Sequence, residues 1–379
     1  MHISVQSGKR VRRSPVHSLP PHAAAAKLGT CGRSKLLALL GASASIAAAT
    51  VLPATASAAV IHRVANACDV SIVPPGEAAA ATDVEAAAGD TVLLIDDSTC
   101  NPVAGPVFDR KTQTTVVSLV SGDGITVAAP GVTLDLNGRF IKSSKDIFGE
   151  QAALGNDVEN AGVTVTAPGV TVTNSNATVA LVDNFTADFD YAKGSDGSKL
   201  QGGLVGGVRA NNIKGGSAHG GGVLAIDRTQ KLLIDSVTLI DLAADPAATL
   251  GDNGIDWKRC TGPTGTLSNS VIQAPLTGMR VRGCTSGGLT VSNNSLNSPG
   301  GAGIEFTRDV KGATVTGNTI SNNLADGVAV RAANEAISIT GNRIQNNGGC
   351  GILTAATAKN ITTLPNAFLN NAGGDVCIK

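Results

Sequence analysis

A repeat of about 24 residues in the last third of the chain constrains the fold more than any other feature of the sequence. Each unit opens with a Gly and a short run of alternating residues, and the successive Gly residues are 24, 25, 24 and 24 positions apart: Gly254, Gly278, Gly303, Gly327 and Gly351. A second alternating run and a third, very short apolar piece follow. Three short strands per period, separated by turn residues, predict stacked β-coils whose inward side chains pack on those of the next coil.

Asparagines recur with the same period. Asn294, Asn318 and Asn342 lie 24 positions apart, where the second strand should bend sharply into the third. Such a bend needs a positive φ, which Asn tolerates better than most residues. Stacked Asn amides can also hydrogen-bond along the axis of the coils. The sequence therefore predicts that these asparagines form a structural ladder and not a binding site.

The Gly-opened strands and the strand–Asn turns resemble the short repeats of right-handed parallel β-helix proteins of the pectin-lyase-like superfamily. The segments GVTLDLNG at 131–138 and AAAGDTV at 86–92 resemble phrases common in its secreted members. The resemblance covers roughly residues 80–379. It implies an all-β fold, a single right-handed parallel β-helix with three short strands per coil. It implies no single activity, because the superfamily includes lyases, hydrolases, esterases, epimerases, phage tailspikes and adhesins.

The N-terminal segment has the order of a secretory signal. Residues 1–58 carry seven Lys/Arg and no Asp or Glu, followed by the apolar run Leu36–Leu52 and the sequence Ala56-Ser57-Ala58. Basic lead, apolar run and small-residue cleavage site predict export to the extracellular space or the periplasm. The apolar run is short and Ala-rich for a membrane span. We therefore expect no membrane span once the signal is removed.

The remainder divides into an N-terminal cap region at 59–119 and the β-helix at 120–379. Irregular spacing in the earlier coils suggests insertions at 142–161, 180–221 and 240–253. Residues 77–88 are Ala-rich and contain no Pro. They predict a short capping helix, because an uncovered first coil would expose a strand edge.

Charge and cysteine content fit an exported protein. After signal removal, 22 Lys/Arg stand against 29 Asp/Glu, a net charge of about −7, which argues against a nucleic-acid partner. Six cysteines remain, an even number that predicts disulfides. Cys260 and Cys284 each follow the repeat Gly by six positions, so they should stack about 4.8 Å apart and form a bridge. The other four flank the cap or lie in the last two coils: Cys68, Cys100, Cys350 and Cys377.

Alternation along the repeat strands also predicts one charged exterior patch. The residues expected to face outward, or to lie just beyond the strands, include Asp256, Lys258, Arg259, Arg280, Arg282, Glu305, Arg308 and Arg331. One interpretation is a solvated face whose opposite charges pair across coils and contribute little stability. The other is a binding site for an anionic sugar chain. The patch stands out because the chain as a whole is poor in charge.

Two loop segments offer weaker candidates. Residues 183–199 contain Tyr191 and several Asp residues, so they could form a cleft wall with a sugar-stacking ring and a calcium-binding set of acids. The alternative is a loop pinned to the helix surface by its own rings. His219 could act as a general base, but a lone loop histidine is more often incidental. No Cys/His cluster suggests zinc.

The sequence favours a protein that acts on an extracellular or cell-wall polysaccharide. If it is an enzyme, β-elimination from a uronic-acid polymer is preferred over hydrolysis, with Lys258 as the base and Arg280 and Arg282 on the carboxylate. Asp256 and Glu305 would orient these arginines or bind calcium. Substrate-binding roles would then fall to Asp256, Arg259, Glu305, Arg308, Arg331 and Tyr191. The alternative is a non-catalytic adhesive β-helix that binds glycans or a partner. The arginine motif of pectate lyases is absent, and the oligomeric state stays open.

Overall fold

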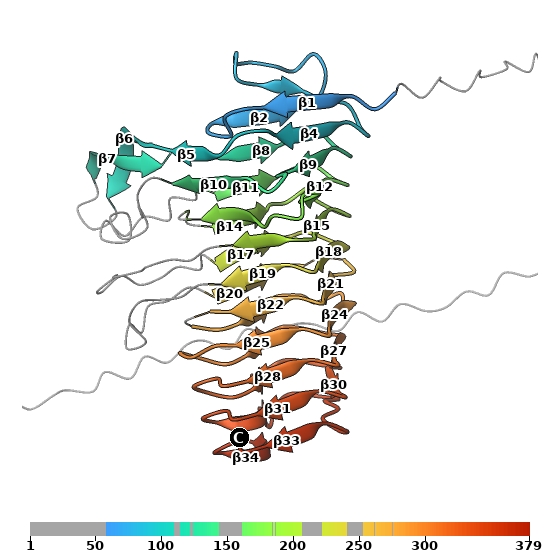
Figure 1. Ribbon diagram of the computed structural model, residues 1–379. Helices are drawn as coiled ribbons and strands as arrows, with labels where there is room; N and C mark the ends of the chain where they lie inside the picture. The colour runs from blue at the N-terminus through green and yellow to red at the C-terminus, as the bar shows by residue number, and fades with distance from the viewer. Residues whose placement is uncertain are drawn as a thin grey trace, which may run out of the picture. The chain divides into compact units, whose positions relative to one another are not determined.

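The computed structural model describes residues 58–379, except 110–113, 122–123, 144–160, 184, 186, 207–221, 241–252, 261 and 275. These residues form three parallel sheets, called A, B and C, whose strands alternate along the chain and stack coil upon coil (Figure 1). No helix occurs among the described residues. The predicted parallel β-helix is confirmed.

Each sheet takes one strand from nearly every coil. Sheet A contains β1 (Ile61–Val64), β4 (Thr91–Leu94), β9 (Thr133–Asp135), β12 (Thr171–Thr173), β15 (Lys199–Gln201), β18 (Leu232–Asp235), β21 (Gly265–Ser268), β24 (Leu289–Ser292), β27 (Ala313–Thr316) and β30 (Ser338–Thr340). Sheet C contains β5 (Ser98–Cys100), β10 (Phe140–Ser143), β13 (Ala180–Asp183), β16 (Leu204–Gly206), β19 (Thr238–Ile240), β22 (Val271–Gln273), β25 (Ser295–Asn297), β28 (Thr319–Ser321), β31 (Arg343–Gln345) and β33 (Ala367–Leu369).

Sheet B is the longest and carries the charged residues singled out above. It contains β3 (Val84–Glu85), β2 (Val70–Val73), β8 (Ile125–Val127), β11 (Ala161–Val165), β14 (Ala187–Tyr191), β17 (Gly222–Asp227), β20 (Asn253–Lys258), β23 (Met279–Arg282), β26 (Ile304–Arg308), β29 (Val328–Val330), β32 (Cys350–Thr354) and β34 (Gly374–Ile378). An antiparallel hairpin, β6 (Pro102–Asp109) and β7 (Thr114–Ser121), departs from the coils after β5 (Figure 1).

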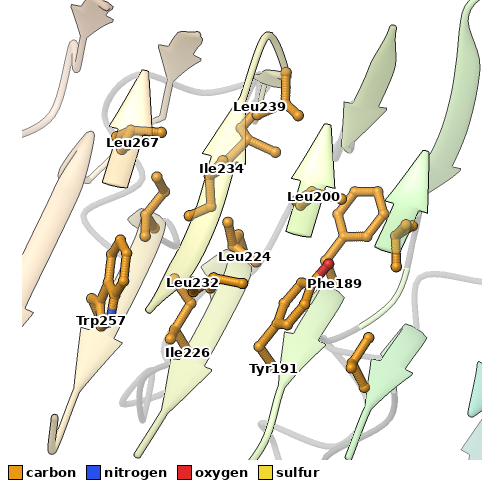
Figure 2. Packing of buried hydrophobic residues seen from close by; sticks show 14 of the residues in the cluster. Phe189, Tyr191, Leu200, Leu224, Ile226, Leu232, Ile234, Leu239, Trp257 and Leu267 are labelled. Carbon is orange, nitrogen blue, oxygen red and sulfur yellow. The ribbon is translucent and has the colours of Figure 1, made fainter. Parts of the chain in front are cut away.

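The core is a continuous column of apolar side chains enclosed by the three sheets. In sheet B the predicted inward residues are completely buried, among them Ile255, Trp257 and Phe306. Figure 2 shows these layers across three consecutive coils, where β-branched and Leu side chains surround the larger rings. Alternation in the sequence therefore gave the correct inner face, because successive residues of a strand point to opposite sides.

The N-terminal coils differ from the prediction in two ways. The expected helix at 77–88 is wrong: the segment consists of turns and the short strand β3, which pairs with β2 and is the terminal strand of sheet B. In addition, coil formation begins at β1 and not at residue 120, since β1, β2 and β5 already belong to sheets A, B and C. Part of the expected cap region is therefore ordinary coil.

The expected insertion at 180–221 is also largely coil. Residues 180–206 form β13, β14, β15 and β16, each in register with its neighbours in the three sheets. The larger spacing to the next coil arises later, within residues 207–221, which lie outside the described part of the chain. Most of the segments 142–161 and 240–253 lie outside it as well.

The disulfides join residues on neighbouring coils. The structure pairs Cys68 with Cys100 and Cys350 with Cys377. Cys260 and Cys284 are bridged as predicted from their equal offset in the repeat, with their Cα atoms 4.3 Å apart. All six cysteines after residue 58 are therefore disulfide-bonded.

Candidate functional site

The candidate site is the outer face of sheet B at β20, β23 and β26. Register places Asp256, Arg280 and Glu305 in one column. Lys258, Arg282 and Arg308 form the second column, because the register shifts by one residue after Val281 and brings Arg308 beside Arg282. Stacked positions are about 4.8 Å apart, so the two columns form one surface.

Asp256 is the centre of this surface and is completely buried. Its Oδ1 accepts a hydrogen bond from Arg280 Nε at 3.2 Å, and its Oδ2 accepts one from Arg282 Nη2 at 2.8 Å. The two arginine side chains remain 20% and 34% exposed. Of the roles open to Asp256, the structure agrees with that of orienting the arginines: the carboxylate lies beneath the longer side chains of the next strand, where it fixes both guanidinium groups.

Two further ion pairs border the arginine pair. Arg259 makes a two-pronged contact with Asp227 through Nε at 2.7 Å and Nη2 at 2.5 Å. Arg331 Nε donates to Glu305 Oε1 at 2.9 Å. Both arginines are about half exposed, so these pairs contribute little to stability. This part of the patch matches the simpler interpretation of charges that pair across coils.

The remaining two cations have no such partner. Lys258 is partly exposed and Arg308 is exposed, and neither makes an ion pair within the described residues. Arg280 and Arg282 share one carboxylate, which leaves one positive charge in excess in that cluster. The surface as a whole is therefore positive, although the chain after residue 58 is negative.

The surface can bind an anion through guanidinium N–H groups that do not contact Asp256. Arg280 contacts Asp256 through Nε alone, so both terminal nitrogens of its guanidinium are free of that carboxylate. A guanidinium with free terminal N–H groups can hold a second carboxylate in a forked contact. An anionic ligand placed there would also lie beside Lys258, which neighbours Arg282 in register.

Tyr191 does not belong to this surface. It is completely buried in the core with Phe189 (Figure 2), and its hydroxyl donates to the carbonyl oxygen of Lys199 at 3.0 Å. Burial raises the pKa of the Tyr191 hydroxyl. The predicted cleft wall with a sugar-stacking ring is therefore wrong, because the ring occupies an inward position of β14.

Among the described residues, the acids of the 183–199 segment do not gather into a metal-binding group. Asp188 is buried and accepts a hydrogen bond from the backbone N–H of Phe185, and Asp196 accepts one from the backbone N–H of Gln230. Over the described residues, no group of three or more His, Cys, Asp or Glu side chains could hold a metal ion. His219 lies outside the described residues.

Asp227 is the residue of this surface that sequence reasoning missed. It pairs in register with Lys258 and neutralises Arg259. The alternation Leu224-Ala225-Ile226-Asp227 resembles that of the later strands and could have revealed it. Asp227 and Lys258 are separated by more than one regular repeat, so the spacing did not show that β17 stacks on β20.

Comparisons with known proteins agree with the fold. A family model described as right handed beta helix region matches residues 253–379. A sequence comparison with the curated proteins finds no match.

The described residues contain no helix that could span a membrane.

Solved structures with similar coordinates have little sequence identity. The periplasmic alginate epimerase AlgG is 10% identical with a TM-score of 0.41, over 76% of this chain and 69% of that chain. The mannuronan C-5 epimerase AlgE4 A-module of Azotobacter vinelandii is 13% identical with a TM-score of 0.35, over 85% and 88%. The enzymatically active domain of tailspike protein 2 of bacteriophage CBA120 is 11% identical with a TM-score of 0.36, over 84% and 41%.

Proposed function

We propose that this right-handed parallel β-helix protein is exported and acts on an acidic polysaccharide through the outer face of sheet B. The observation that carries the proposal is the arginine pair anchored on a buried carboxylate. Asp256 holds Arg280 and Arg282 from below, while their exposed parts and Lys258 face outward. Such an arrangement is preorganised to receive a carboxylate without first ordering two long side chains.

The chemistry favoured for this surface is β-elimination from a uronic-acid chain. Arg280 and Arg282 would bind the carboxylate attached to C5 and stabilise the negative charge that develops there. Lys258 Nζ would take the C5 proton. The C5–H electron pair then forms the C4–C5 double bond, the C4–O4 bond breaks, and the leaving oxygen takes a proton from solvent.

Export belongs to the proposal as well. The basic lead, apolar run and Ala56-Ser57-Ala58 predict a cleaved signal, and three disulfides fit an oxidising compartment. Expression with the native leader followed by sequencing of the mature N-terminus tests this part separately.

A binding protein without catalysis is the second candidate. It is favoured by the observation that Arg259 and Arg331 are already paired with carboxylates, as in a stable solvated surface. Both candidates require the same excess of positive charge. They differ only in whether Lys258 is needed for turnover or for attraction.

The experiment compares Lys258→Ala and Arg282→Ala with the wild type on polygalacturonate, alginate and a glycosaminoglycan. Binding is measured by affinity electrophoresis and cleavage by the ultraviolet absorbance of the unsaturated product. If Lys258 is the base, K258A abolishes cleavage and retains most binding, whereas R282A weakens both. The matched control is Arg343→Ala, which removes an arginine from the sheet C strand β31, two coils beyond that of Arg282.

The outcomes separate the candidates. Binding without cleavage by the wild type supports the non-catalytic candidate. Loss of binding in R343A to the same degree as in R282A would mean that attraction is nonspecific. No binding of the wild type to any polymer contradicts the proposal. Because local cations carry the attraction, added salt should weaken binding steadily.

A further inference from the structure

The outer face of sheet A carries a two-column array of hydroxyl groups. Over four consecutive coils, every outward position of β21, β24, β27 and β30 is Ser or Thr. We call these eight residues the hydroxyl face: Thr266, Thr290, Thr314 and Ser338 in one column, and Ser268, Ser292, Thr316 and Thr340 in the other. All eight are partly or fully exposed.

This composition is not a general property of the coils. Sheet C of the same four coils presents mixed outward residues, namely Val271, Gln273, Ser295, Asn297, Thr319, Ser321, Arg343 and Gln345. Sheet B presents charged residues. Thr favours strands in general, but only three of the eight outward residues of sheet C in these coils are Ser or Thr. The hydroxyl face is therefore a distinct surface of the molecule.

The hydroxyl groups are largely unused within the protein. Ser268 Oγ donates to Asp235 Oδ1 at 2.6 Å, at the margin of the array. The other seven hydroxyls make no hydrogen bond within the described part of the chain. Each can both donate and accept, so the face offers a regular set of open hydrogen-bonding positions.

The array is regular in two directions. The ladders that join these four strands contain no register shift, unlike the ladder between β23 and β26. Beneath it, Leu267, Val291, Val315 and Ile339 are completely buried, so the face rests on a packed layer. Hydroxyl positions should therefore repeat about 4.8 Å along the coil axis and about 6.7 Å along each strand.

We propose that the hydroxyl face binds the surface of an ice crystal. It has no charge to attract a polyanion and no ring on which a sugar could stack, whereas a lattice of water can meet hydroxyls repeated in two directions. The oxygen atoms on a prism face of hexagonal ice likewise repeat along two perpendicular directions, at spacings of the same order. β-Branched Thr has few rotamers, so its hydroxyl loses little freedom on binding.

The test uses the purified full chain in three assays: ice shaping, thermal hysteresis, and partition of labelled protein into slowly growing ice. The variant Thr314→Lys places a long charged side chain in the middle of the array. The matched control Thr319→Lys makes the same change on sheet C, five residues later. Circular dichroism and thermal unfolding verify that both variants retain the fold.

Wild type and T319K should be enriched in ice to the same extent, and T314K should be enriched several-fold less. Exclusion of the wild type from ice would overturn the proposal, and so would equal partition of the two variants. Retention on microcrystalline cellulose or chitin without ice binding would also overturn it, in favour of a crystalline glycan. The polyuronate assays above probe sheet B, so the two proposals fail independently.

Discussion

Asn318 shows what a single polar residue contributes in this fold. Its Nδ2 lies 2.9 Å from the carbonyl oxygen of Val291 and 2.9 Å from Asn342 Oδ1, and its Oδ1 accepts from both nitrogens of Asn294. The predicted ladder is thereby confirmed. The positive φ, however, belongs to the residue before each Asn, such as Asn293 and Gly317. The asparagine itself points inward and satisfies the backbone of the bend.

Asn318→Ala should destabilise the protein by about 2–3 kcal/mol, because it leaves several buried donors and acceptors without partners. The measurement is the free energy of unfolding in urea. Asn297→Ala is the matched control, since Asn297 faces outward on sheet C, and it should stay within about 0.5 kcal/mol of wild type. Equal losses in the two variants would contradict a structural role for the ladder.

At the scale of the element, the first coil depends on one carboxylate. Asp90, at the start of β4, accepts hydrogen bonds from the backbone N–H groups of Val60 and Ala87 at 2.8 Å each, and lies 3.2 Å from His62 Nε2. The two backbone donors, followed by His62, lower the pKa of Asp90. These contacts tie the strand β1 to the turn before β4, where the coil stack begins.

The lowered pKa has a defined consequence for acid stability. The stabilisation by ionised Asp90 is complete above the unfolded-state pKa of about 3.9 and is lost as pH falls through the lower folded-state value. Asp90→Asn should therefore lower Tm at pH 7, and the difference from wild type should close in acid. Asp375→Asn, which changes an exposed carboxyl at the last coil, serves as control. A Tm difference that persists unchanged below pH 3 would refute the role of Asp90.

The elements also show where sequence reasoning succeeded. The coils after Gly254 were predictable because a fixed period and strict alternation determine both strand position and facing. Tyr191 was misplaced because irregular spacing hid its strand, so residue type was used without knowledge of facing. Asp256 is buried because the long side chains of Arg280 and Arg282 on the next strand extend over it, and alternation along a single strand cannot predict such a contact. A second ladder, Asn323–Asn347–Asn371, was missed because its Asn-Asn pairs look like ordinary turns.

At the scale of the whole molecule, stability should be local, because each coil contacts only its neighbours. The three disulfides are distributed accordingly. Cys68–Cys100 lies in the first coils, Cys260–Cys284 in the middle of the chain and Cys350–Cys377 in the last coils. Each should restrain the coils beside it without affecting distant ones.

Replacing both Cys350 and Cys377 by Ala should therefore loosen the last coils by about 2–4 kcal/mol and leave the first ones unchanged. Native-state hydrogen exchange measures this directly. Amide protection should fall in β32 and β34 and persist in β9 and β12. A uniform fall across all three sheets would show that the molecule unfolds as one cooperative unit.

The register of the coils also determines how such a chain can change in length. Met279 and Ile304 are 25 residues apart where the other intervals between these later strands are 24, and after Val281 the offset rises to 26, between Arg282 and Arg308. Leu289 and Ala313, on the following strands, are again 24 apart. Small insertions are thus accommodated around one strand and do not propagate to the next sheet. Duplication of a whole repeat would add one strand to each of the three sheets. Such a duplication would therefore lengthen the hydroxyl face and the charged face together.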